Sequence, residues 1–217
     1  MLRLARGPLV AGLTVVFAVL MAGSALAATT NVSIHNTAFN AQDVKVALGD
    51  TVLWTNNDPF GHTSTSANAN ANTKLKRNPD GSNGPSLWGS PTIAASGGTF
   101  GFVFSWAGTF NYHCEIHNFM QGSVSVKPKA GLVTPATGSP FIKITTGKAA
   151  LPADYVFHVQ VSVNGGAFSD FVTNSTALKL KMTNPTPGTY QFQVSVEKTS
   201  TPTGHSYYAK SKTVTVS

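Results

Sequence analysis

The stretch that decides the fold runs from Gly108 to Gly122 and reads Gly-Thr-Phe-Asn-Tyr-His-Cys-Glu-Ile-His-Asn-Phe-Met-Gln-Gly. Phe110, Tyr112 and Cys114 alternate with polar residues, as on a β-strand with one face toward the core. This alternation predicts that Cys114 faces the core. It also predicts that His113, one position earlier, lies on the opposite face as a surface residue.

The loop after this strand carries three metal-binding side chains. Cys114, His117 and Met120 are spaced Cys-x2-His-x2-Met, and Cys114 is the only cysteine in 217 residues. A lone cysteine cannot form an internal disulfide. A thiolate, an imidazole and a thioether together suit copper better than zinc, which does not use a thioether. His62, which follows the apolar strand at Thr51–Trp54, is the candidate for a second imidazole.

Four linked segments extend this pattern over the first half of the chain. They are Gly49–Asn56 before the first histidine, His62-Thr63, Gly97–Phe100 with the alternating aromatics that follow it, and Gly108–Cys114. Together they resemble a cupredoxin, a small blue copper protein of the plastocyanin and amicyanin kind. The two-residue gap between His117 and Met120 is similar to the short ligand loop of amicyanins. The resemblance covers residues 28–127.

This resemblance implies an all-β fold, a Greek-key β-sandwich with one type 1 copper. The four ligands that it implies are His62, Cys114, His117 and Met120. Such a trigonal site with a weak axial methionine suits both copper(I) and copper(II). All four positions are filled by protein, so no site for a substrate is left open. The implied function is the transfer of single electrons between redox partner proteins, without enzymatic activity.

Two other functions are open at this point. A His-Cys pair also occurs in copper nitrite reductases and multicopper oxidases, where the histidine binds a second, catalytic copper; here that residue would be His113. The remaining histidines are not clustered in the sequence, which favours a single copper. A copper acquisition or tolerance protein without a redox partner is the third possibility.

Residues next to the ligands are expected to support the site and to present it to a partner. Asn57 and Thr63 are candidates to orient the loop that carries His62. Exposed apolar residues beside the two histidines would form a small contact patch for a redox protein. The residues of this expected patch are Pro59, Phe60 and Phe119.

The N-terminus predicts export. Residues 1–27 contain Arg3 and Arg6, an apolar run, and the small-residue ending Ser24-Ala25-Leu26-Ala27, as in a secretory signal peptide. A transmembrane anchor is the alternative, but the apolar run is short for a bilayer. We therefore expect a periplasmic or extracellular protein without stable membrane insertion after signal cleavage.

The second half has its own pattern of alternating strands. Residues 128–140 are rich in proline, glycine and threonine, which predicts a linker. Residues 141–217 contain alternating runs such as Tyr155–Val163, which ends in the hairpin signal Asn164-Gly165-Gly166. With Pro187–Val194, this part resembles a fibronectin type III or related immunoglobulin-like β-sandwich. The resemblance implies a spacer or adhesion module that binds a surface or another protein.

Charge and composition exclude several classes of function. The chain has a formal net charge of +7, which becomes +5 without the two signal-peptide arginines. Residues 128–217 hold all of the excess, with eight lysines and three acidic residues. These lysines follow the expected strands instead of clustering with aromatics and glycines, which favours a solvated sheet face over nucleic-acid binding.

Residues 64–86 show no periodicity and are expected to form a long surface loop.

Overall fold

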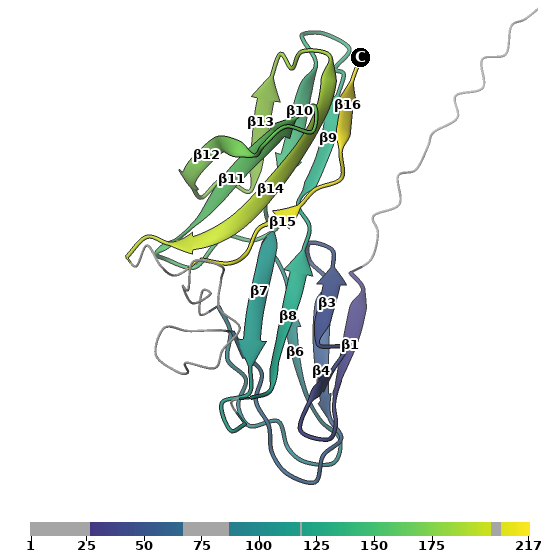
Figure 1. Cartoon of the computed structure of the whole chain (residues 1–217), viewed down its shortest axis with the longest axis vertical. Coiled ribbons are helices and arrows are strands. Elements are labelled where there is room, and N and C mark those ends of the chain that lie inside the picture. Colours follow the sequence, from purple (N-terminus) through teal and green to yellow (C-terminus); the bar gives the residue numbers. More distant parts are fainter. Residues whose placement is uncertain (1–26, 67–86, 118, 201–204) are drawn as a thin grey trace, which may run out of the picture.

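The computed structural model of this chain describes residues 27–66, 87–117, 119–200 and 205–217. Within these ranges every regular element is a β-strand and no helix occurs, which confirms the all-β prediction (Figure 1). No helix of the described residues is long and apolar enough to cross a membrane. The expected signal peptide at 1–27 lies almost entirely outside the described residues.

Residues 29–126 form a sandwich of two four-stranded sheets. The first sheet has the order β2-β1-β4-β6 and consists of β1 (Thr29–Ile34), β2 (Phe39–Asn40), β4 (Thr51–Asn56) and β6 (Gly98–Val103). The second has the order β3-β8-β7-β5 and consists of β3 (Asp43–Val46), β8 (Gln121–Val126), β7 (Gly108–His113) and β5 (Thr65–Ser66). Each sheet combines consecutive strands, β1 with β2 and β7 with β8, with neighbours that are far apart in sequence, such as β1 beside β4 and β3 beside β8, as in a Greek-key arrangement.

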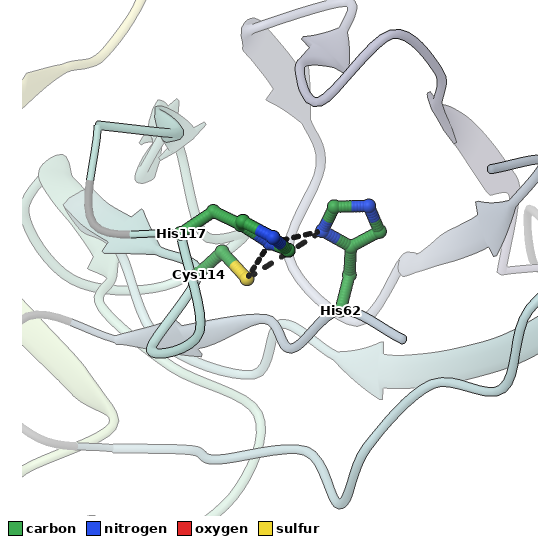
Figure 2. A group of neighbouring side chains, drawn as sticks. All are labelled: His62, Cys114 and His117. Carbon is green, nitrogen blue, oxygen red and sulfur yellow. Dashed lines mark hydrogen bonds between the residues drawn. The ribbon is translucent and has the colours of Figure 1, made fainter. Parts of the chain in front are cut away.

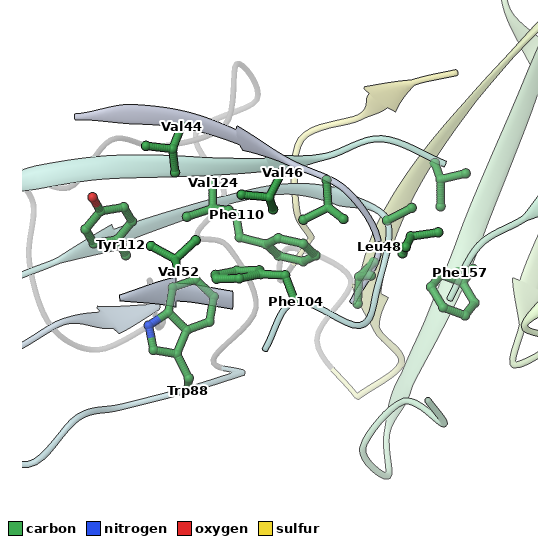
Figure 3. Packing of buried hydrophobic residues seen from close by; sticks show 14 of the residues in the cluster. Val44, Val46, Leu48, Val52, Trp88, Phe104, Phe110, Tyr112, Val124 and Phe157 are labelled. Atoms are coloured by element: carbon green, nitrogen blue, oxygen red, sulfur yellow. The ribbon is translucent and has the colours of Figure 1, made fainter. Parts of the chain in front are cut away.

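Aromatic side chains join the two sheets of this sandwich. Trp54 of β4 is fully buried, and its ring centroid lies 5.4 Å from that of Tyr112 in β7. Phe39 packs on the same tyrosine ring at 4.7 Å. Phe104 packs edge to face on Trp88, with the ring centroids 5.1 Å apart, and Figure 3 shows Phe104 on the side of this aromatic cluster nearer to Leu48. The core therefore fixes the direction of β7, the strand that leads directly to Cys114.

Residues 129–216 form a second sandwich. Its three-stranded sheet has the order β13-β10-β9 and consists of β9 (Lys129–Val133), β10 (Phe141–Thr145) and β13 (Lys179–Thr183). The other sheet has the order β12-β11-β14-β15, with β16 also paired to β14. Its strands are β11 (Tyr155–Val163), β12 (Ser169–Ser175), β14 (Gly188–Lys198), β15 (Ala209–Lys210) and β16 (Val214–Val216). The predicted hairpin after β11 is confirmed, because Asn164 and Gly165 both have positive φ angles.

Two stretches expected to be irregular contain strands. Within the expected linker at 128–140, Lys129–Val133 forms β9 and pairs antiparallel with β10. Within the expected loop at 64–86, Thr65 and Ser66 form β5 and pair with the end of β7. Glycine and proline content misled the first prediction, and β5 is too short to show a periodicity. Residues 67–86 lie outside the described part of the chain.

The two sandwiches meet at one end of β7 and share a continuous core. Thr109 and Tyr207 exchange two backbone hydrogen bonds of 2.9 and 3.0 Å, and the indole nitrogen of Trp106 donates to the carbonyl oxygen of Ala149 at 2.9 Å. An added Cβ at Gly147 would lie 3.1 Å from the carbonyl oxygen of Ser105, so the backbones approach closely there. The loop after the other end of β7 points away from the second sandwich (Figure 1).

Candidate metal centre

The loop between β7 and β8 is held closed by its own backbone. The N–H of Cys114 donates to the carbonyl oxygen of Met120 at 3.1 Å, and the N–H of Met120 donates to that of His117 at 2.9 Å. Cys114 is fully buried and Met120 is 2% exposed, whereas His117 is half-buried. The Cys-x2-His-x2-Met spacing therefore folds into a tight turn with the sulfur residues inside and one histidine at the rim.

Three ligand atoms from two loops converge beside this turn. The sulfur of Cys114 lies 3.7 Å from Nδ1 of His62 and 3.8 Å from Nδ1 of His117, and the two Nδ1 atoms are 3.1 Å apart. Figure 2 shows the three side chains pointing toward one point. Within the described ranges they are the one group of at least three His, Cys, Asp or Glu side chains close enough to hold a metal ion.

The size and chemistry of this triangle fit a metal ion. The point equidistant from the three atoms lies about 2 Å from each, within the range of metal–nitrogen and metal–sulfur bonds. Two imidazole nitrogens and a thiolate in a trigonal arrangement are the in-plane donor set of blue copper sites. Burial and the neighbouring His62 ring lower the pKa of His117, which favours the neutral imidazole that a metal requires.

Thr63 joins the two ligand loops. Its N–H donates to the sulfur of Cys114 at 3.3 Å, and its hydroxyl oxygen accepts a hydrogen bond from the N–H of Glu115 at 2.8 Å. A hydrogen bond to sulfur stabilises negative charge on a thiolate and so affects the potential of a bound metal. Thr63, a candidate to orient the loop that carries His62, is thus hydrogen-bonded to both Cys114 and Glu115 of the other loop.

Asp58 orients the ring of His62. Its carboxylate lies 2.9 Å from Nε2 of His62, which leaves Nδ1 free to face Cys114. Burial alone would raise the pKa of Asp58, but the backbone N–H groups of Thr37 and Asn36 and the His62 ring hold it below the usual value. A carboxylate on the outer nitrogen of a metal-binding histidine fixes its tautomer and increases its basicity.

Asp58 was missing from the expected set, whereas Asn57 belongs to it as a candidate to orient the loop that carries His62. The Asn57 side chain donates to the hydroxyl of Ser33 at 2.8 Å and ties the loop to β1. The signal for Asp58 was present in the sequence, because a buried ligand histidine needs an acceptor on its second nitrogen and this carboxylate stands four residues before His62.

His113 is buried, not on the surface. It is 1% exposed, and neither ring nitrogen forms a hydrogen bond with a residue in the described ranges. It ends β7 between Thr65 of β5 and Gln121 of β8, so it lies in the middle of a sheet. The period-two pattern predicts a face for His113 opposite to that of Cys114, but alternation cannot tell whether the second face of a strand is covered. Burial lowers its pKa, which favours a neutral ring.

Apolar side chains surround the exposed edge of His117. The ring centroids of Phe60 and Phe119 lie 5.5 and 6.2 Å from that of His117. Phe119 is 64% exposed, Ile116 is 52% exposed and Phe60 is 43% exposed. Pro59, the third residue of the expected patch, is also exposed. Ile116 was not expected as part of it.

Comparison with known proteins identifies the family. Residues 26–127 match the family described as copper binding proteins of the plastocyanin/azurin family. A plastocyanin of Scenedesmus fuscus is 30% identical over 91 residues, which cover 41% of this chain and 86% of the relative.

Similar solved structures include two mutants of amicyanin. One, in the reduced Cu(I) form at pH 4, is 28% identical, with a TM-score of 0.36, and the match covers 49% of this chain and 88% of that one. The other, also reduced, is 25% identical with a TM-score of 0.36, covering 46% of this chain and 82% of that one.

The chain therefore belongs, through its first half, to the plastocyanin/azurin family of copper-binding proteins. Copper is the metal that this family binds and that the His62, Cys114 and His117 triangle fits.

Proposed function

We propose that this protein is an exported type 1 copper protein that carries single electrons between redox partner proteins. The observation that carries the proposal is the convergence of Nδ1 of His62, Nδ1 of His117 and Sγ of Cys114 on one point in the first sandwich. The copper would supply the redox chemistry by alternating between its cuprous and cupric states.

Each residue of the site has a defined task in this proposal. Cys114 would supply a thiolate to the copper, and His62 and His117 would supply two imidazole nitrogens. Met120, which is buried and hydrogen-bonded through its backbone to Cys114, would supply a thioether sulfur as a fourth, weaker ligand. Asp58 and Thr63 hold this set fixed, so little needs to move when an electron arrives. A preformed site of this kind lowers the reorganisation that accompanies electron transfer.

The route of the electron is proposed to pass through the edge of His117. This ring is the half-buried ligand; Phe60 and Phe119 lie beside it, and the exposed Ile116 directly precedes it in the chain. A small apolar patch allows a partner to approach closely and to leave quickly, as in transient redox complexes. The patch consists of Pro59, Phe60, Ile116 and Phe119.

The second sandwich is proposed to be a fibronectin type III-like module. The strand orders support this, because a three-stranded sheet accompanies a five-stranded one in which β15 and β16 pair with successive parts of β14 and so share one strand position. Tyr190, near the start of β14, donates its hydroxyl to the carbonyl oxygen of Thr186 at 2.8 Å. A tyrosine that bonds the backbone a few residues upstream is typical of immunoglobulin-like sandwiches.

The role of the apolar patch can be tested with Phe119→Glu. A charge at the contact must be desolvated when a partner binds, so electron exchange with a redox protein should slow several-fold. The visible spectrum should stay nearly unchanged, because the ligands are untouched. The matched control is Val163→Glu, since Val163 is 42% exposed on the second sandwich. Equal exchange rates for both variants would contradict the proposed route.

A further inference from the structure

The three-stranded sheet of the second sandwich has one apolar face and one basic face. Ile142 and Ile144 of β10 are fully buried in the core. Residues of the opposite parity point away from it, and the exposed ones include four lysines. These lysines, one on β9, one on β10 and two on β13, are Lys129, Lys143, Lys179 and Lys181.

The register of the strands places these lysines next to one another. Lys143 lies directly opposite Lys181, and Thr145 lies between Lys179 on one side and Lys129 on the other. Directly opposed like charges on a sheet destabilise it. In the described part of the chain none of the four lysines forms an ion pair. The basic face therefore has unneutralised positive charge.

Acidic residues are segregated from this face. Residues 128–153 and 171–196, which contain all three strands of the sheet, have no aspartate or glutamate. Asp170 and Glu197 lie in β12 and β14 of the other sheet, where each is 2.7 Å from a ring nitrogen of His158. The backbone of the third acidic residue, Asp154, accepts a hydrogen bond from Thr199, just after β14. The lysines are scattered in the sequence, but the fold gathers four of them on one face.

A hollow lies between two of these lysines. Its volume is about 260 Å³, and Lys129, Gly131, Lys143 and Thr145 are among its lining residues. No atom lies within 4 Å of a Cβ added at Gly131, so the glycine leaves the hollow open. An anionic group entering it would lie beside the side chains of Lys129 and Lys143.

We propose that this lysine face docks the protein on an anionic lipid bilayer, with a lipid phosphate group in the hollow above Gly131. Lysines near an anionic membrane contribute additively through long-range attraction, and a sheet face can present several of them to a flat surface. A peripheral contact of this kind needs no membrane-spanning helix.

The composition of the face favours a membrane over other polyanions or a protein. Residues 128–217 contain no arginine, the residue preferred for bidentate recognition of phosphate in nucleic acids. The ring of Phe141 is covered by Nζ of Lys181 at 4.0 Å and is not free for stacking on a base. None of the large exposed hydrophobic side chains among the described residues lies on these strands, so the face lacks an anchor for a protein partner.

Docking through this face would leave the copper site accessible. The sheet lies in the upper body in Figure 1, whereas the loop after β7 lies at the opposite end of the first sandwich. A redox partner could then contact the rim of His117 while the second sandwich stays on the membrane. The inference itself depends only on the second sandwich, so it can fail while the copper function holds.

The test measures binding of the purified copper-loaded protein to vesicles of pure phosphatidylcholine and to vesicles that also contain phosphatidylglycerol. We expect binding only to the anionic vesicles, weakened by added salt. The double variant Lys143→Gln/Lys181→Gln should bind about thirtyfold more weakly. Gly131→Leu, which fills the hollow without changing the charge, should weaken binding several-fold.

The matched control is Lys198→Gln/Lys210→Gln, which removes the same charge from the other sheet. Thermal unfolding of each variant establishes that it is folded. An equal loss of binding in the control would show that binding depends on the net charge of the protein and not on this face, and would overturn the proposal. Binding to double-stranded DNA or to a sulfated polysaccharide without binding to anionic vesicles would overturn it as well. Unchanged binding by Gly131→Leu would reject the phosphate position.

Discussion

The carboxylate of Asp58 and the ring of His62 form a buried pair, with Oδ2 lying 2.9 Å from Nε2. Because that nitrogen is occupied, Nδ1 on the other side of the ring faces Cys114. The same carboxylate accepts hydrogen bonds from the backbone N–H groups of Asn36 and Thr37. Asp58 therefore connects a ligand to the β1–β2 turn, far from the cysteine loop in sequence.

Asp58→Asn should lower the affinity for copper by about ten- to a hundredfold, because an amide is a weaker partner for the His62 ring. A competition titration with a chelator of known affinity measures this. Asp50→Asn is the control, since Asp50 accepts hydrogen bonds from the backbone N–H groups of Ala28 and Ala47. Equal affinities for the two variants would show that the pair does not support the metal site.

Thr63→Val should lower the free energy of unfolding by about 1–3 kcal/mol, because it leaves the N–H of Glu115 without its acceptor. The N–H that Thr63 donates to the sulfur is retained, so copper binding should persist. Thr63→Ser keeps the hydroxyl and should lose less stability in chemical denaturation. If the two variants lose the same free energy of unfolding, the hydrogen bond from Glu115 to the Thr63 hydroxyl does not stabilise the protein.

Much of the metal site could be predicted from the sequence because its ligands lie in short motifs. The spacing of Cys114, His117 and Met120 specifies a loop by itself, and His62 follows a recognisable strand. The pairing of Asp58 with His62 has a local signal in their four-residue spacing, whereas the burial of His113 depends on what packs against it, which no local pattern records. The lysine face was hidden for the same reason, since only the pairing of β9, β10 and β13 brings its residues together.

The sequence predicts the β-strands and the hairpin of the second sandwich but not its first strand, β9. The alternation in Tyr155–Val163 and the Asn164-Gly165 turn gave one hairpin correctly. The strand at Lys129–Val133 was taken for linker because the prolines and glycines around it indicate irregular structure. Its pairing with β10, a tertiary contact, makes it a strand.

The second sandwich should lose stability as the pH rises through the titration of His158. Burial opposes protonation, but the hydrogen bonds to Asp170 and Glu197 outweigh it and raise the pKa of His158. A raised pKa gives a stabilising contribution that is fully present below about pH 6.5 and is lost as the pH passes the folded-state pKa. Tyr208 also contacts this ring, at 3.1 Å.

Unfolding of the native protein and of His158→Gln, measured across this pH range, tests the prediction. The stability difference between them should be largest at the acidic end and should shrink toward alkaline pH. A difference that grows with pH would contradict the assigned direction.

Phe157→Ala should destabilise both sandwiches. Phe157 is fully buried in the cluster that also contains Leu48 of the first sandwich (Figure 3), and its ring lies against Gly147 at the junction. Truncating a buried phenylalanine costs about 3–5 kcal/mol. On heating, the copper absorption and the β-sheet circular dichroism of the variant should therefore both be lost at a lower temperature than in the native protein, in a single transition. Two separate transitions, with only one shifted, would show that the sandwiches unfold independently.

The central claim is that His62, Cys114 and His117 hold one type 1 copper. The most direct measurement adds copper(II) to the metal-free protein and records the metal content and the visible spectrum together. We predict one copper per chain and an intense blue absorption from charge transfer between thiolate and copper, which Cys114→Ser abolishes. A colourless protein, an absorption that survives Cys114→Ser, or two coppers per chain would contradict the account.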